Sequence, residues 1–152
     1  ALDRLIAEGR REGITFRFDR LEQVPNTLLA HQLLQLAGQE GRDQAPIADD
    51  MMHAFFEDGV DIGKRDVLLD IARRHRLAEE AVILAWADDA ARQFVRSREA
   101  QVRASGLSGV PGFLLNRRLL VVGAQPADTL INAFDQAMFG EGEDGLGELL
   151  LN

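Results

Sequence analysis

The sequence contains no cysteine among its 152 residues. Without a thiol, these residues provide no disulfide, no thiolate nucleophile and no cysteine ligand for zinc or an iron–sulfur cluster. Only three histidines are present, and they lie far apart at His31, His53 and His75. That spacing does not match the grouped ligands of a zinc site. We therefore expect no metal site and no catalytic residue for thiol chemistry within these residues.

Long apolar runs and an excess of basic charge are also missing. No run reaches the roughly 20 apolar residues that a membrane helix needs. The net charge is −8, and an acidic chain is repelled by nucleic-acid phosphates. We therefore expect neither a membrane nor a nucleic acid as partner. The first residues carry charges throughout and lack the apolar block of a signal peptide, so we expect a cytoplasmic protein.

The chain has enough apolar residues for a hydrophobic core, since 46% of it is hydrophobic. Apolar side chains recur at helical spacing over most of the sequence. The predicted helices cover residues 1–12, 27–37, 46–58, a segment around 67–71, 77–86, a segment from 88 or 89 to about 104, and 126–139. The glycine-rich, acidic residues 140–152 are predicted to be a flexible tail.

Local signals refine three of these helices. Asn26 is a good N-cap for the helix over 27–37, and Gly38 is predicted to end it. Pro46 opens the next helix, where the missing N–H of proline is harmless. Five apolar residues of that helix are predicted to form a buried stripe: Ile47, Met51, Met52, Phe55 and Phe56.

Two kinds of strand pattern interrupt the helices. Residues 14–18 alternate as Ile-Thr-Phe-Arg-Phe, which predicts a short strand. Residues 112–115 and 119–122 are short apolar runs on either side of a polar turn, which predicts a β-hairpin. Its runs are apolar on both faces, as in sheets covered on both sides. The hairpin therefore requires a cover, and we expect further strands or a homodimer.

Several segments together resemble one family. Residues 109–113 read Gly-Val-Pro-Gly-Phe, the hairpin follows, and residues 122–126 read Val-Gly-Ala-Gln-Pro before the last helix. This order resembles the closing half of a DsbA-family thioredoxin domain. Residues 25–27 (Pro-Asn-Thr), 30–34 (Ala-His-Gln-Leu-Leu) and 55–63 (Phe-Phe-Glu-Asp-Gly-Val-Asp-Ile-Gly) resemble the helical insertion of its FrnE-like branch. The resemblance covers roughly residues 1–139.

The resemblance implies an α/β, thioredoxin-like fold of the DsbA type with a mainly helical insertion, whose sheet is incomplete in this chain. Residues 1–24 are then a connecting helix and short strand, and residues 25–105 are the helical insertion. Residues 106–139 are the carboxy-terminal half of the thioredoxin-like domain. The family's catalytic turn precedes the matched part, and nothing in the sequence matches it.

The same resemblance implies which residues face a substrate. The proline of this loop is cis in thioredoxin folds, so Val110–Pro111 is predicted to be a cis corner beside the active site. Val110 is then held extended, ready to pair with an extended substrate. His31 is the other candidate, as a group lining a substrate or glutathione cleft, although a partly exposed helix histidine explains it more simply.

The implied function of the intact protein is thiol–disulfide exchange with a substrate protein. One alternative is a glutathione-dependent isomerase or transferase of the 2-hydroxychromene-2-carboxylate isomerase type, which uses glutathione as cofactor. The other is a non-catalytic, dimeric binding module. A Cys-x-x-Cys at the family's active-site turn favours the oxidoreductase, and a lone serine there favours the isomerase.

Overall fold

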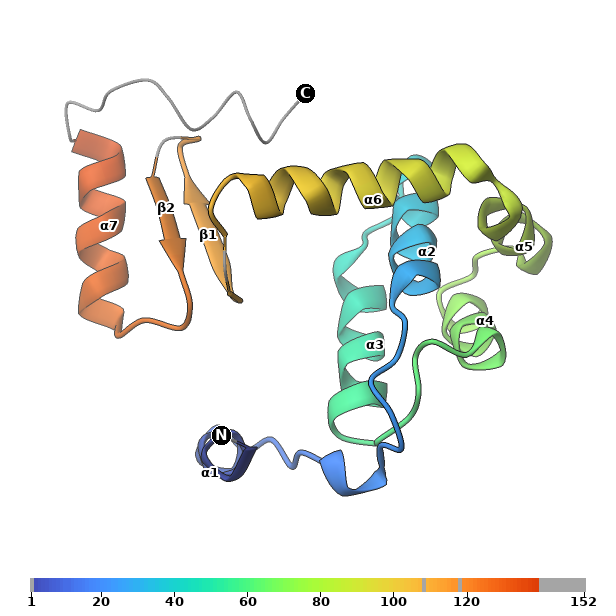
Figure 1. The fold of residues 1–152 in the computed structure, drawn as a ribbon, viewed down its shortest axis with the longest axis horizontal. Coiled ribbons are helices and arrows are strands. Elements are labelled where there is room, and N and C mark those ends of the chain that lie inside the picture. Colours follow the sequence, from blue (N-terminus) through green and yellow to red (C-terminus); the bar gives the residue numbers. More distant parts are fainter. Residues whose placement is uncertain (1, 108, 118, 140–152) are drawn as a thin grey trace. The chain divides into compact units, whose positions relative to one another are not determined.

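The computed structural model describes residues 2–107, 109–117 and 119–139 (Figure 1). Most of the described chain is helical, and the predicted acidic tail, 140–152, lies outside it. The elements are α1 (Leu2–Arg11), the 3₁₀ helix η1 (Phe18–Arg20), α2 (Leu28–Gln39), α3 (Ala45–Phe56), α4 (Arg65–Arg74), α5 (Glu79–Ala87), α6 (Asp89–Ala104), β1 (Gly112–Leu115), β2 (Leu119–Val122) and α7 (Ala127–Phe139).

The chain divides into two compact units. Unit 1 runs to Val95 and unit 2 begins at Arg96, so the division falls within α6. Unit 1 contains α1 to α5, and unit 2 contains the hairpin and α7. The domain limits predicted from the sequence, at 24/25 and 105/106, stay predictions.

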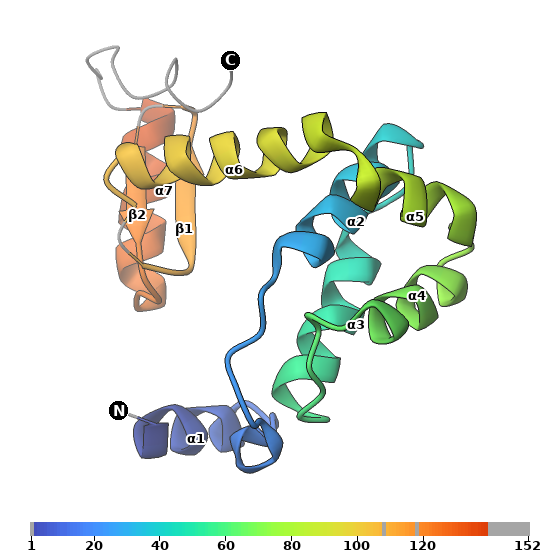
Figure 2. The same ribbon diagram turned by 45° about the vertical axis from the view of Figure 1, so that its right-hand side comes forward.

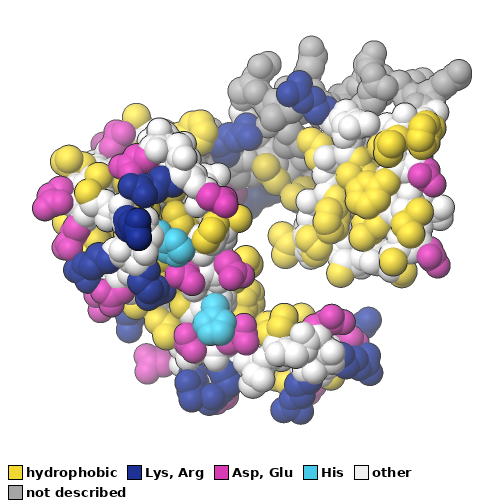
Figure 3. Space-filling view, turned by 180° about the vertical axis from the view of Figure 1, so that it is seen from behind, with side chains coloured by type: hydrophobic (Ala, Val, Ile, Leu, Met, Phe, Trp, Pro, Cys, Tyr) yellow, Lys and Arg dark blue, Asp and Glu magenta, His cyan; other side chains and the backbone are white. Residues whose placement is uncertain are grey.

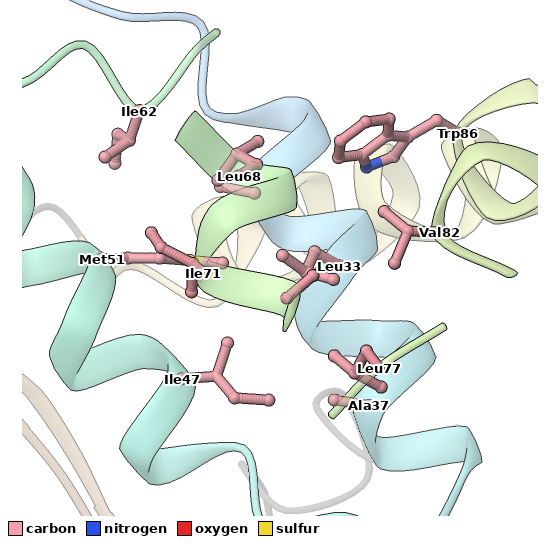
Figure 4. Packing of buried hydrophobic residues seen from close by; sticks show 12 residues of the cluster. Leu33, Ala37, Ile47, Met51, Ile62, Leu68, Ile71, Leu77, Val82 and Trp86 are labelled. Atoms are coloured by element: carbon pink, nitrogen blue, oxygen red, sulfur yellow. The ribbon is translucent and has the colours of Figure 1, made fainter. Parts of the chain in front are cut away.

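The core of unit 1 lies among α2, α3, α4 and α5 (Figure 4). Leu33 is fully buried, and it faces Ile71 of α4 and Val82 of α5. Trp86 is also buried, and its indole Nε1 donates a hydrogen bond to the carbonyl oxygen of Leu29 at 3.0 Å. The buried cluster is Ala30, Leu33, Ala37, Ile47, Met51, Ile62, Leu68, Ile71, Ala72, Leu77, Val82 and Trp86.

Both ends of α2 differ from the prediction by one or two residues: the helix begins at Leu28, so Thr27 and not Asn26 is its N-cap residue. The Asn26 side-chain oxygen accepts a hydrogen bond from the Leu28 amide at 3.0 Å, which satisfies one free donor of the first turn. The prediction that Gly38 ends the helix was wrong, since α2 continues to Gln39. Gly41 takes the left-handed conformation instead, with φ of 69°.

The predicted stripe on α3 is only partly buried. Ile47 and Met51 lie in the core. Met52 is 51% exposed, so the prediction that it is buried was wrong. Helical periodicity places Met52 one residue, about 100°, away from Met51. Met51 therefore lies in the core, whereas Met52 lies at the edge of the buried stripe and is half exposed.

The predicted strand at residues 14–18 is absent. Residues 14–17 carry no regular structure, and Phe18 begins η1. A strand needs a partner to complete its ladder, and all the other described elements of unit 1 are helices. The alternating phenylalanines pack on α3 instead: the Phe16 and Phe18 rings stack at 5.0 Å, and Phe56 lies edge-on to both. The alternating apolar residues here therefore form an aromatic cluster and not a strand.

Ionic contacts tie the end of α4 to α3. The Asp50 carboxylate oxygen Oδ2 accepts hydrogen bonds from His75 Nε2 at 2.8 Å and from Arg74 Nε at 3.2 Å. The hydrogen bond from His75 lowers the pKa of Asp50 most; partial burial opposes it, and Arg74 lowers the pKa further. The ionised form of Asp50 is therefore favoured by the fold.

We expect Asp50→Asn to make the free energy of unfolding less dependent on pH in the acidic range. Because folding lowers the pKa of Asp50, its contribution is complete above the ordinary aspartate pKa of about 3.9 and is lost as the pH falls below it. At pH 7 the variant should be less stable by under about 1 kcal/mol, since Asp50 and its two partners, His75 and Arg74, are all partly exposed. Urea unfolding from pH 7 to pH 2 measures this. A constant difference down to pH 2 would contradict the assignment.

Unit 2 is built around the predicted hairpin, whose two strands have the predicted bounds. The strands pair antiparallel, with Phe113 opposite Val121 and Leu114 opposite Leu120. Asn116 and Arg117 take positive φ values of 49° and 59°, which turn the chain; the remaining turn residue, Arg118, lies outside the described chain. Helix α7 packs on both strands and lies behind them in Figure 2.

No helix in the described ranges is both long and apolar enough to cross a membrane.

Candidate functional site

The loop that enters β1 contains the predicted corner. The Val110–Pro111 peptide bond is cis, as expected. The Pro111 carbonyl oxygen accepts a hydrogen bond from the Gly123 amide at 2.7 Å, which fixes the loop to the residue after β2. At the next position, Gly112 leaves room for the Leu107 side chain, which would clash with any Cβ there. The corner is therefore held from both sides.

Val110 is presented outward by this corner. Its side chain is 88% exposed, which is unusual for a large apolar residue. Within the described ranges, no hydrogen bond uses its backbone N–H or C=O. An exposed apolar side chain beside a free donor and acceptor offers what an extended peptide needs in order to pair. The geometry therefore suits a binding position next to the edge of the hairpin.

His31 lies in unit 1, on α2, whereas Val110 and Pro111 lie in unit 2. Its side chain is exposed and has no hydrogen-bond partner in the described part of the chain. The structure does not place the two units relative to each other, so a shared site of His31 and the Val110–Pro111 corner stays a prediction.

The next residue on α2, Gln32, was overlooked in the sequence. It is buried, with 1% exposure, and its Nε2 donates to the Ala85 carbonyl oxygen at 3.1 Å. Its Oε1 is buried without a partner among the described residues, and so is that of Gln35. One signal in the sequence pointed to this contact: Gln32 is a polar residue between Ala30 and Leu33 of the same helix, and a buried polar side chain needs a hydrogen-bond partner. The contact links α2 to α5.

The described residues contain no catalytic group for redox chemistry. Cysteine is absent from the sequence, and no group of three potential metal ligands occurs in residues 2–107, 109–117 and 119–139. His53, for example, contacts Glu57 at 3.0 Å on the surface of α3, as a local i, i+4 pair. The corner offers a fixed loop, an exposed apolar side chain and a backbone that is unpaired within the described ranges, and these features suit binding.

A hairpin followed by a helix, entered through a cis-proline corner and preceded by a helical block, defines a thioredoxin-like domain of the DsbA type. Comparison with known families agrees, since the family described as "DSBA-like thioredoxin domain" matches residues 2–135. The chain belongs to this family. A search of the curated proteins gave no match.

Two solved structures resemble the chain. The probable DsbA oxidoreductase SCO1869 from Streptomyces coelicolor is 33% identical, with a TM-score of 0.76 over 91% of this chain. A candidate protein disulfide isomerase from Nitrosomonas europaea is 19% identical, with a TM-score of 0.71 over 90% of this chain, which shows a common fold. The chain spans 59% and 69% of the lengths of these two proteins. The narrower FrnE-like assignment stays a prediction.

Proposed function

We propose that this chain forms the substrate-binding part of a thiol–disulfide oxidoreductase that acts on polypeptides. Membership of the DsbA-like family supports the reaction class, and the exposed Val110 beside an unpaired backbone supports the binding role. The redox-active thiols come from residues outside these 152, because the sequence contains no cysteine.

In the proposed reaction, a thiolate attacks one sulfur of a substrate disulfide. A new S–S bond forms between the two, the substrate S–S bond breaks, and the second substrate sulfur leaves as a thiolate. A second thiolate then attacks the mixed disulfide and releases the reduced substrate, leaving the two attacking sulfurs joined as a disulfide. The Val110 backbone holds the substrate extended during both steps.

The position of Val110 is the observation on which this proposal depends. Pairing to a backbone amide and carbonyl is independent of substrate sequence, which suits an enzyme that acts on many proteins. The anchoring bond from Gly123 to Pro111 keeps the partner groups in place before the substrate arrives. Glutathione-dependent isomerisation and a dimeric binding module stay predictions, as does cytoplasmic location.

We expect an extended peptide to bind at residues 109–112. The probe is an unstructured peptide whose single cysteine is blocked as a mixed disulfide with 2-mercaptoethanol. In a titration of the ¹⁵N-labelled chain, the amides of Gly109, Val110 and Gly112 should shift most. Val110→Asp should weaken binding by about tenfold, because a carboxylate repels the peptide carbonyls and removes the apolar contact, a loss of roughly 1.4 kcal/mol.

Val24 provides the matched control. It is also a valine before a proline and is 92% exposed. Val24→Asp introduces the same charge at an equally open position, so it should leave both the affinity and the shift pattern unchanged. The proposal fails if the peptide shifts no amide in residues 109–112, or if the two variants weaken binding equally.

A further inference from the structure

The Val122–Gly123 peptide unit ties the Val110–Pro111 corner to the segment that precedes α7. Its N–H, which belongs to Gly123, donates to the Pro111 carbonyl oxygen at 2.7 Å. Its carbonyl oxygen, which belongs to Val122, accepts a hydrogen bond from the Gln125 side-chain Nε2 at 2.9 Å. One peptide unit therefore carries a hydrogen bond at each end, and the Gln125 side chain makes the second of them.

These two hydrogen bonds are coupled through the geometry of the peptide unit. A trans peptide unit is planar, and its N–H and C=O point in opposite directions. The orientation of the Val122 carbonyl therefore sets the direction of the Gly123 N–H. The Gly123 backbone does not set it, because its φ is 83° and glycine adopts positive and negative φ about equally readily. The orientation consequently depends on the bond that the Val122 carbonyl accepts, which comes from Gln125.

Gln125 is itself held in place by the start of α7. It precedes Pro126, and a residue before proline is restricted to extended backbone conformations. The Pro126 carbonyl oxygen in turn accepts a hydrogen bond from the Leu130 amide at 3.2 Å. The hairpin ends on the other side, since its last pair is Gly112 opposite Val122. The Gln125 side chain therefore connects the anchored start of α7 to a peptide unit just beyond the ladder.

We propose that Gln125 is a positioning residue for the peptide-binding corner. It orients the Val122–Gly123 unit, and that unit holds the Pro111 carbonyl. The Pro111 ring restricts its own φ to about −65°, so anchoring its carbonyl also limits how the Val110 carbonyl can turn. This last step rests on the proposed function, in which the Val110 backbone pairs with an extended substrate.

The donor N–H of the Gln125 amide is the group that this role requires. Gln125→Met keeps a side chain of similar length but has no donor. Gln125→Glu keeps the shape, but its ionised carboxylate only accepts hydrogen bonds, and its oxygens repel the Val122 carbonyl oxygen. The two variants therefore remove the donor without shortening the side chain.

Hydrogen exchange of the free chain tests the positioning step. In Gln125→Met, the Gly123 amide should exchange about threefold faster, a modest effect because the lost bond is exposed to water. The Leu130 amide should exchange as before, since its bond to Pro126 does not involve the Gln125 side chain. A general loss of stability would speed up both amides, so their difference separates positioning from a merely structural role.

Peptide titration tests the consequence for binding, with the mixed-disulfide peptide and the ¹⁵N-labelled chain described above. Gln125→Glu should weaken binding by about fivefold. Gln136→Glu is the matched control, because Gln136 is an exposed glutamine on α7 and the variant gains the same charge. Acidic side chains already lie at the edge of this unit, the right-hand body in Figure 3, so the control should leave the affinity unchanged.

The two measurements fail independently. If the peptide shifts no amide of the unaltered chain in residues 109–112, the proposed function fails, and the exchange of Gly123 still decides whether Gln125 orients the loop. The positioning role is overturned if Gly123 exchanges equally fast with and without the Gln125 amide. It is also overturned if Gln125→Glu binds the peptide as tightly as Gln136→Glu does.

Discussion

Replacing Trp86 by alanine should destabilise unit 1 by about 3–5 kcal/mol, the largest loss that we expect from a single substitution. Trp86 is 1% exposed and fills the space between α2 and α5 (Figure 4). Removing the indole leaves a cavity and takes the donor away from the Leu29 carbonyl oxygen. It also removes the ring on which the Arg65 guanidinium lies, 5.6 Å from the centroid.

Leu84→Ala on the same helix is the control for Trp86→Ala. Leu84 is 70% exposed, so its truncation should change the free energy of unfolding by less than about 0.5 kcal/mol. Urea unfolding should be followed by far-UV circular dichroism, since Trp86 is the only tryptophan and its fluorescence is lost in the variant. Similar losses in both variants would mean that α5 does not pack as described.

The sequence predicted elements well where local signals and packing agree. The hairpin strands have their predicted bounds because two short apolar runs flank a polar turn, and both runs can be buried or paired. Residues 14–18 show the limit. Their alternation of apolar and polar side chains satisfies the strand pattern, yet strand formation depends on a partner that local sequence does not specify. The phenylalanines of this segment pack with Phe56 in an aromatic cluster, which needs no hydrogen-bonded partner strand.

Periodicity also predicts which residues share a face but not what covers that face. On α7, Ile131 and Phe134 lie within about 60° of each other, but the buried face is the one around Ala133, about 160° from Ile131 and 100° from Phe134. On α3, the same reasoning included Met52, which is 51% exposed. At the candidate site, the resemblance predicted the cis Val110–Pro111 corner. The exposure of Val110 and the bond from Gly123 to Pro111 depend on tertiary structure and became visible only there.

Gly59→Ala should cost about 3 kcal/mol, because two effects coincide at this position. Gly59 has φ of 68°, where a side chain costs roughly 1–2 kcal/mol. Its backbone also touches the segment around η1: a Cβ would lie 2.5 Å from the Arg20 Cβ and 2.9 Å from the Arg17 carbonyl oxygen. Backbone cannot give way as a flexible side chain does, so residues 17–20 must move.

Gly41→Ala separates the two effects. Gly41 has nearly the same φ, 69°, but no atom lies within 4 Å of the added Cβ, so it should cost only about 1–2 kcal/mol. The second readout is amide hydrogen exchange at Arg17, whose N–H donates to the Phe56 carbonyl oxygen at 2.7 Å. Exchange there should speed up in Gly59→Ala beyond what its loss of global stability explains, and not in Gly41→Ala. If both variants lose equal stability and Arg17 exchanges alike, the η1 segment does not pack on Gly59, and the aromatic cluster that joins it to α3 is not held as described.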